Sequence, residues 1–340
     1  MATLPASPGH HLRSTPQTVV WGRLTPHVAP VLRVQSGETV AIDTLNPVGV
    51  PLQDPAGFFA QHGLPITDAA ADILAVMAAV PKGPGPHMLT GPVAVAGAKP
   101  GDTLEVRIED IRVRSPAYGV NVSYPGAGGL PQLLHEPWLR VLPIDPHHQT
   151  AGFSADLALP LAPFMGTMGV APTREVSSIP PGPFGGNIDL KHLRPGSRLY
   201  LPVQVPDALF FAGDGHGMQG HGEVNLTALE TSLTGVFTFI LHRDCPLEGP
   251  VAETPHAYLP MGLDADLDLA AEHAVRRSVQ ALSRRCGLSP QEAYALASLA
   301  VDFEITQIVD GIKGVHGWIP KIMVDPTRPD DWWGPAACQS

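Results

Sequence analysis

The chain has 340 residues, a formal net charge of −11 and 44% apolar residues, which is enough apolar material for one large domain or two moderate ones. The acidic balance and the absence of a lysine or arginine run argue against nucleic acid and acidic membranes as partners. No apolar stretch reaches the roughly 18 residues of a membrane span, and the first 16 residues lack the pattern of a secretory signal. We therefore expect a cytoplasmic protein.

Three cysteines are present, Cys245, Cys286 and Cys338. Their spacing matches no zinc ribbon and no CxxC motif. We expect them to lie in a reducing compartment and to form no disulfide framework.

Proline and glycine separate short apolar runs along the whole chain, which is typical of a mainly β protein. A tight turn followed by a strand recurs three times, at residues 35–42, 99–108 and 194–201. In the second copy the apolar residues Leu104, Val106 and Ile108 alternate with charged ones, as in a half-buried antiparallel strand. Further strands are predicted at residues 18–21, 31–34, 93–96, 139–142, 209–212, 223–231 and 235–241.

Helical periodicity appears in three places. A short helix is predicted over residues 68–80, where Pro81 ends it. Apolar residues at helical spacing predict a long helix over residues 264–286, closed by Gly287. Ser289 and Glu292 form a capping-box pattern that opens another helix, which should end near residue 303.

We predict a mainly β fold, with β-sandwich or jelly-roll-like parts, barrel-like elements and a few α-helices, two of them near the C-terminus. Residues 1–175 should form an N-terminal β-rich part and residues 176–325 a C-terminal β-rich part that carries the site. We expect the two parts to form one intertwined catalytic unit. Residues 326–340 are expected to be a tail, in which two tryptophans anchor it to the body or to another subunit.

The segment 213–223 is the most informative part of the sequence, because it places two histidines and two acidic residues among five glycines. Asp214 and His216 are two residues apart, and so are His221 and Glu223. Residues two apart in a strand point to the same side, and glycines allow the chain to turn tightly. Both pairs can thus converge on one divalent metal ion, although a polar turn without a metal would have the same composition.

Several phrases in order resemble the acetamidase/formamidase family, from about Val19 to about Lys321. They are residues 85–92, 97–111, 164–172, 185–189, 201–223 and 305–316. The resemblance implies a mainly β fold, a homo-oligomer of two or more subunits, and metal-assisted hydrolysis of short amides to a carboxylate and ammonia. At position 221 this chain departs from the family, which usually has Asp where His221 stands.

Our hypothesis for the metal ligands is His87, Asp214 and His216, followed by Asp189. Each could instead have a structural role, for example as a turn cap. The two histidines favour zinc, whereas a site dominated by carboxylates would favour calcium, magnesium or manganese.

Glu223 is the candidate general base and later the acid, unless it binds the metal directly. Gln219, His221 and Asn187 could orient the substrate or hold the oxyanion, and Asn187 could equally serve only a left-handed turn. Phe184 could shape the substrate pocket. No Gly-x-Ser-x-Gly elbow is present, and the cysteines lack basic surroundings, so we expect no covalent nucleophile.

The sequence thus predicts a metal-dependent amidohydrolase that cleaves a small linear amide such as formamide or acetamide. One alternative is a related hydrolase with a different or larger amide. A cupin-like metalloenzyme is another, although Asp214 stands where a cupin would have a histidine. A non-catalytic β-sandwich binding protein is the last.

Overall fold

The computed structural model describes residues 8–323, and its main body is built from two sheets. The first is nine-stranded, and its strands follow the order β1 (His10–Leu12), β5 (Thr39–Asp43), β17 (Leu233–His242), β7 (Thr103–Val113), β15 (Arg198–Pro202), β18 (Val251–Glu253), β19 (Ala257–Asp264), β21 (Lys313–Pro320) and β20 (Asp302–Gln307). The second is six-stranded, with the order β14 (Gly185–Asn187), β12 (Phe164–Val170), β16 (Phe210–His216), β6 (Met88–Val95) and β2 (Val19–Trp21), and with β4 (Leu32–Val34) also paired to β6.

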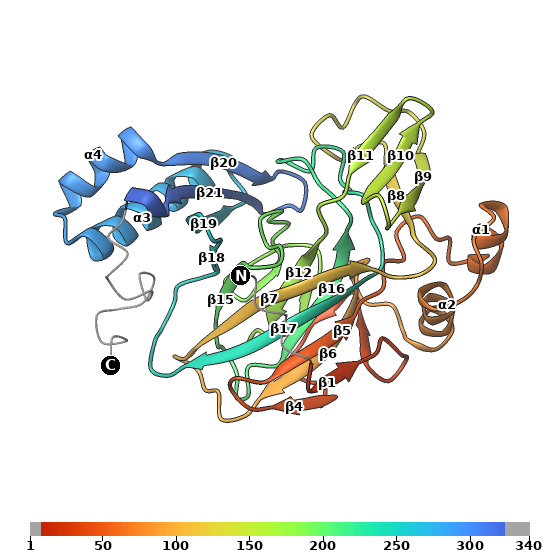
Figure 1. The fold of residues 1–340 in the computed structure, drawn as a ribbon, viewed down its shortest axis with the longest axis horizontal. Coiled ribbons are helices and arrows are strands. Elements are labelled where there is room, and N and C mark those ends of the chain that lie inside the picture. Colours follow the sequence, from red (N-terminus) through yellow and green to blue (C-terminus); the bar gives the residue numbers. More distant parts are fainter. Residues whose placement is uncertain (1–7, 324–340) are drawn as a thin grey trace.

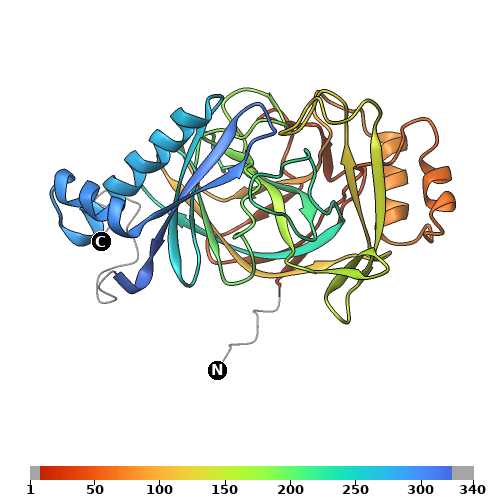
Figure 2. The ribbon, with the colours of Figure 1, turned by 90° about the horizontal axis from the view of Figure 1, so that it is seen from above.

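Smaller elements surround this body (Figure 1). One is a four-stranded sheet of β11 (Leu157–Pro160), β10 (Thr150–Ser154), β9 (Trp138–Asp145) and β8 (Tyr118–Ser123), and another is the pair β13 (Val176–Ser177) and β3 (Arg23–Leu24). The helices are α1 (Pro55–Gln61), α2 (Ala69–Ala79), α3 (Leu267–Cys286) and α4 (Pro290–Ala300), with a 3₁₀ turn at Lys321–Met323. Figures 1 and 2 show α1 and α2 at one end of the molecule and α3 and α4 at the other.

The main hydrophobic core lies between the nine-stranded and the six-stranded sheet. Phe210 of β16 packs on Phe237 and Phe239 of β17, with ring centroids 6.2 and 5.1 Å apart. All three side chains are fully buried, and each contributes roughly 1.5–3 kcal/mol by leaving water. The predicted mainly β fold with sandwich-like packing is therefore confirmed.

The three turn-and-strand repeats all enter the nine-stranded sheet, as β5, β7 and β15. Their turn glycines, Gly37, Gly101 and Gly196, have φ between +89° and +96°, a region that residues with a Cβ rarely adopt. The charged face of β7 is less exposed than predicted, because Glu105 on that face is only 2% exposed. It is held by Arg107 at 2.6 Å and His242 at 2.7 Å, so pairing rather than solvent accommodates its charge.

The predicted C-terminal helices are confirmed with their caps. Asp266 accepts hydrogen bonds from the first turn of α3, and Gly287 ends that helix in the left-handed conformation. Ser289 and Glu292 form the capping box of α4. The helix predicted over residues 68–80 is α2.

The secondary structure differs from the prediction in one predicted strand and in one helix that was not predicted. Residues 223–231 form turns instead of a strand, because Glu223 and Leu226 have φ of +47° and +86°, which a strand does not tolerate. Helix α1 was not predicted, since its seven residues are too short for a periodic pattern.

The two predicted parts of the chain share their sheets. The nine-stranded sheet takes β1, β5 and β7 from residues before 175 and its other strands from residues after it. The tail at 326–340, with Trp332 and Trp333, lies outside the described residues. Within residues 8–323, no helix has both the length and the apolar character needed to cross a membrane. Cys245 is disulfide-bonded, which departs from the expectation that the cysteines are reduced.

Candidate active site

Strand β16 brings Asp214 and His216 together at its C-terminal end. His216 Nε2 lies 3.3 Å from Asp214 Oδ2, and both side chains are almost fully buried. Glycines alternate with them for a steric reason. A Cβ at Gly213 would lie 2.5 Å from the Met88 carbonyl oxygen, and one at Gly215 would lie 2.4 Å from that of Thr231. The glycines therefore let neighbouring chain segments approach β16 closely, whereas the sequence had suggested a tight bend.

Glu230 completes this group, although no sequence pattern pointed to it. Its Oε2 lies 3.4 Å from His216 Nε2. Asn46, which follows β5, donates from Nδ2 to Glu230 Oε2 at 2.6 Å and to Asp214 Oδ1 at 3.3 Å. The amide thereby fixes both carboxylates in place.

His87 approaches the same group from the start of β6. Its Nε2 lies 3.7 Å from Asp214 Oδ2. On the other side of the ring, Nδ1 lies 3.1 Å from the Ser178 carbonyl oxygen, to which it can donate. A histidine whose Nδ1 proton is held by a backbone carbonyl presents Nε2 as a ligand atom.

A second set of carboxylates lies beside the Nδ1 atom of His216. Asp189 Oδ1 is 3.9 Å from His216 Nδ1, and Glu223 forms a close group with these two residues. Gln219 connects them, because its Oε1 lies 3.0 Å from His216 Nδ1 and its Nε2 donates to the Asp189 carbonyl oxygen. Asp310 is also buried and lines the same cavity.

The carboxyl groups of the site differ in the direction in which their pKa values are shifted. Burial first, and then the charges of Asp310 and Glu230, raise the pKa of Glu223 well above its ordinary value. Burial likewise raises the pKa of Asp310 to about 6. Burial opposes ionisation of Asp214 as well, but His87 and His216 outweigh it and lower its pKa. Asp214 is therefore ionised at neutral pH, while Glu223 can hold a proton.

A cavity of about 270 Å³ is lined by His87, Asp214, Glu223, Glu230 and Asp310. Asn187 lines it, and its Oδ1 accepts a hydrogen bond of 2.6 Å from Thr167 Oγ1. The amide nitrogen of Asn187 is then left to donate elsewhere. The wall also has apolar residues, which are Trp21, Val48, Val50, Leu52, Met77, Ile179 and Leu226.

Five of the predicted site residues do not line this cavity. Asp189, His216 and Gln219 belong to the groups described above, whereas Phe184 and His221 lie elsewhere. Phe184 packs in the main core, with its ring against Gly182 and Gly186. His221 instead lines a separate cavity of about 220 Å³, to which Gln219 and Glu223 also contribute, and its Nε2 lies 2.7 Å from Glu304 Oε2. The positive φ of Glu223 breaks the strand geometry from which the second convergent pair was inferred.

Two groups of residues in this site could hold a metal ion. One is Asp214, His216 and Glu230; the other is Asp189, His216 and Glu223. The donor atoms fit a borderline divalent ion. Among the residues that the structure describes, His216 Nε2 and both carboxylate oxygens of Asp189 are buried without a hydrogen-bond partner. Such atoms are costly to bury unless something binds them.

Three residues of the site were not found from the sequence: Asn46, Glu230 and Asp310. Asp310 lies within the phrase 305–316 that carries the family resemblance, and this was a usable signal. Asn46 and Glu230 lie in irregular segments and are brought in only by the pairing of distant strands.

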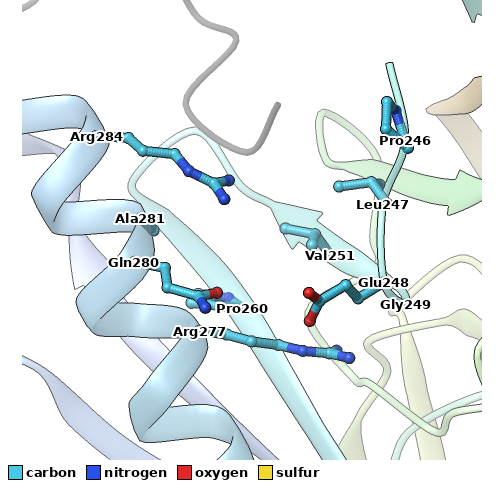
Figure 3. A pocket seen from close by; sticks show the side chains of 10 residues that line it. All are labelled: Pro246, Leu247, Glu248, Gly249, Val251, Pro260, Arg277, Gln280, Ala281 and Arg284. Atoms are coloured by element: carbon cyan, nitrogen blue, oxygen red, sulfur yellow. The ribbon is translucent and has the colours of Figure 1, made fainter. Parts of the chain in front are cut away.

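Another cavity, of about 410 Å³, lies between α3 and the segment 246–251 (Figure 3). Arg277 reaches across it toward Gly249 and donates from Nη1 to the Met261 carbonyl oxygen at 2.6 Å. The cavity shares no lining residue with the candidate active site. Its wall offers no group of histidines and carboxylates comparable to that around His216.

Comparison with known proteins decides the family. The model of the acetamidase/formamidase family matches residues 10–179 and 176–245. This chain belongs to the acetamidase/formamidase family. It is an enzyme of the predicted class, a hydrolase acting on carbon–nitrogen bonds of amides.

Solved structures and a curated relative agree with this. An acetamidase from Bacillus halodurans is 30% identical and has a TM-score of 0.76, and the match covers 92% of this chain and 98% of that one. An acetamidase from Yersinia enterocolitica is 27% identical with a TM-score of 0.78, over 93% of each chain. A formamidase from Methylophilus methylotrophus is 27% identical over 191 residues, which are 41% of this chain and 47% of that enzyme.

Proposed function

We propose that this chain is a metal-dependent amidohydrolase that cleaves a small linear amide, of the formamide or acetamide kind, to a carboxylate and ammonia. The observation that carries the proposal is the buried group of Asp214, His216 and Glu230 beside a cavity of about 270 Å³. Family membership supports the reaction class, and it removes the basis for the cupin-like alternative. We further expect the enzyme to be a cytoplasmic homo-oligomer.

His87, Asp214, His216 and Glu230 would hold the metal ion. A bound divalent ion can lower the pKa of a water molecule to near 7 and polarise an amide carbonyl. Zinc fits the two imidazoles best, and the two carboxylates leave manganese, magnesium and calcium as alternatives. Asp189, beside the Nδ1 atom of His216, is a further ligand or a partner that orients this histidine.

Glu223 is the proposed proton carrier. Its raised pKa allows the carboxylate to take a proton near neutral pH and to release it to the leaving nitrogen. Asn187 can donate from its amide nitrogen to the substrate carbonyl oxygen, because Thr167 already occupies its Oδ1. Gln219 holds the His216 ring and the Asp189 backbone together, so we give it a positioning role.

A related hydrolase for a larger amide is the second candidate. It is favoured by the apolar part of the cavity wall, which includes Trp21, Val50 and Met77. An amide with an apolar substituent would bury that substituent there, whereas formamide has none to bury. Pocket contacts of this kind change specificity by about 10–200-fold for each methylene group.

Ammonia release from a panel of amides tests both candidates. Formamide, acetamide, butyramide and benzamide should be compared on purified protein whose metal content has been measured. Hydrolysis of at least one of these amides, lost together with bound metal in Asp214→Asn, is the expected result. Highest kcat/KM for formamide or acetamide favours the first candidate, and highest kcat/KM for butyramide or benzamide favours the second. Ammonia from none of them would contradict the proposal.

A further inference from the structure

Three histidines and a glutamate meet at a second place, outside the proposed reaction. Glu304 on β20 lies opposite His316 on β21 in the antiparallel register. His192 comes from the segment between β14 and β15, and His221 from the loop after β16. The pair of strands β20 and β21 thus supplies two of the side chains, and two segments distant from it in the sequence supply one each.

The four side chains point to a common centre. From Glu304 Oε2, the distances to the Nε2 atoms of His221, His316 and His192 are 2.7, 3.4 and 3.7 Å. One ligand atom from each residue lies within 4.8 Å of all the others. The ring centroids of the three histidines form a nearly equilateral triangle, with sides of 5.2, 5.3 and 5.5 Å.

The atoms that face this centre are in contact with one another but make few well-directed hydrogen bonds. Within residues 8–323, His192 Nε2, His316 Nε2 and Glu304 Oε2 are buried without a hydrogen-bond partner. Leaving one such polar group unsatisfied costs about 1–3 kcal/mol. A hydrogen bond between His221 and Glu304 could satisfy only one of the three imidazoles, so an ion pair alone does not explain the group.

The best-buried histidine is also held from behind. His316 is fully buried, and its Nδ1 lies 2.8 Å from Thr306 Oγ1. The His192 ring packs against Trp318, with centroids 4.9 Å apart. Partners that fix the far nitrogen or the plane of an imidazole are the usual support of metal-ligating histidines.

We propose that His192, His221, His316 and Glu304 form a second metal site, which binds zinc or a similar borderline transition-metal ion. Three imidazole nitrogens and one carboxylate oxygen are a suitable tetrahedral ligand set for zinc. All the ligands come from the protein, so we assign the site a structural role. It does not depend on the reaction proposed above, because none of its four residues takes part in that reaction.

Such an ion would fix the loop that carries the proton carrier. Gly222, between His221 and Glu223, donates to the Thr306 carbonyl oxygen at 3.0 Å and accepts from the Ile308 N–H at 3.1 Å. A metal bound by His221 and Glu304 would add a stronger link between the same two segments. The expected effect is greater order of residues 219–223.

Zinc titration of metal-stripped protein by calorimetry tests the proposal. The wild type should bind about one more zinc ion per chain than Glu304→Gln, or bind it at least about tenfold more tightly. His192→Gln should behave like Glu304→Gln. The matched control is His148→Gln, which removes an imidazole that is 72% exposed and should bind zinc like the wild type. Equal zinc stoichiometry and affinity in all four proteins would overturn the proposal.

A second measurement needs no substitution and so decides the matter if a variant does not fold. Crystals of the wild type grown with zinc should show an anomalous zinc peak within about 2.0–2.3 Å of at least three of the four ligand atoms. A zinc peak elsewhere in the molecule with none at this place would contradict the proposal. Amide hydrolysis is not part of either readout, so failure of the proposed function would leave this test unaffected.

Discussion

The two clusters that share the segment 216–223 differ in how they treat their carboxyl groups. Around His216, several buried carboxyl groups lie close together, and the pKa values of Glu223 and Asp310 rise. The second cluster contains a single carboxyl group, that of Glu304. His316 and the other imidazoles lower the pKa of this group to about 2. Burial, and then the nearness of other carboxyl groups, lets a carboxyl group hold a proton near neutral pH, whereas a partly exposed one among imidazoles stays ionised. The first arrangement suits proton transfer, and the second suits permanent metal binding.

The largest effect is expected from Glu223→Gln, because it removes the group that can carry a proton. We expect kcat for amide hydrolysis to fall by about 10²–10⁴-fold, while the metal content of the purified protein stays unchanged. Ammonia release and elemental analysis measure the two quantities. Glu136→Gln, at an exposed position, is the control for the same chemical change. Wild-type activity in Glu223→Gln would remove Glu223 from the mechanism.

Exchange of glutamate for glutamine in the second cluster should have a different result. Glu304→Gln should weaken zinc binding at the second site and lower kcat by less than about tenfold, because the general acid–base group is retained. Steady-state kinetics beside the calorimetric titration would show this. If kcat falls as far as in Glu223→Gln, the two clusters form one catalytic unit, and the separate structural role of the second cluster is contradicted.

The raised pKa of Asp310 predicts how stability depends on pH. The folded protein holds this proton up to a pKa of about 6, whereas the unfolded chain releases it near 3.8. The free energy of unfolding of metal-free protein should therefore contain a part that is lost as the pH rises through this range. Asp310→Asn should lack that part. Urea unfolding of both stripped proteins at several pH values measures it, and a constant difference between them would count against the assignment.

The smallest effect is expected at the apolar wall of the candidate active-site cavity. None of the four residues of the second cluster contributes to this wall. Val50→Ala removes two methyl groups from this wall and should raise KM for butyramide several-fold, a cost of about 1 kcal/mol. KM for formamide should stay the same, since formamide has no apolar group to contact the wall. Equal changes for both amides would show that Val50 acts through the fold instead of through substrate contact.

Much of the fold was predictable because its signals are local. The helix-ending residue Gly287, the capping residue Ser289 and the turn glycine Gly101 each act within a few residues of chain. The strand predicted at 223–231 was wrong because its alternation belongs to turns with positive φ, and apolar alternation alone does not report φ.

The candidate site was predictable only where its residues share one strand or one recognisable phrase. Asp214 and His216 are neighbours on β16 and were found together. Glu230 and Asn46 meet them through strand pairing across the chain, which no local pattern reports. His221 was expected beside Glu223, but distant partners, Glu304 and His316, determine where its ring lies.

Reconstitution of the metal-stripped Glu304→Gln variant with zinc shows whether the site at Asp214, His216 and Glu230 needs a metal ion, because the second site is weakened in this variant. We predict that ammonia release from the preferred amide is absent without zinc, rises with added zinc and saturates near one ion per chain. Full ammonia release from protein that elemental analysis shows to be metal-free would contradict a metal-dependent site at Asp214, His216 and Glu230.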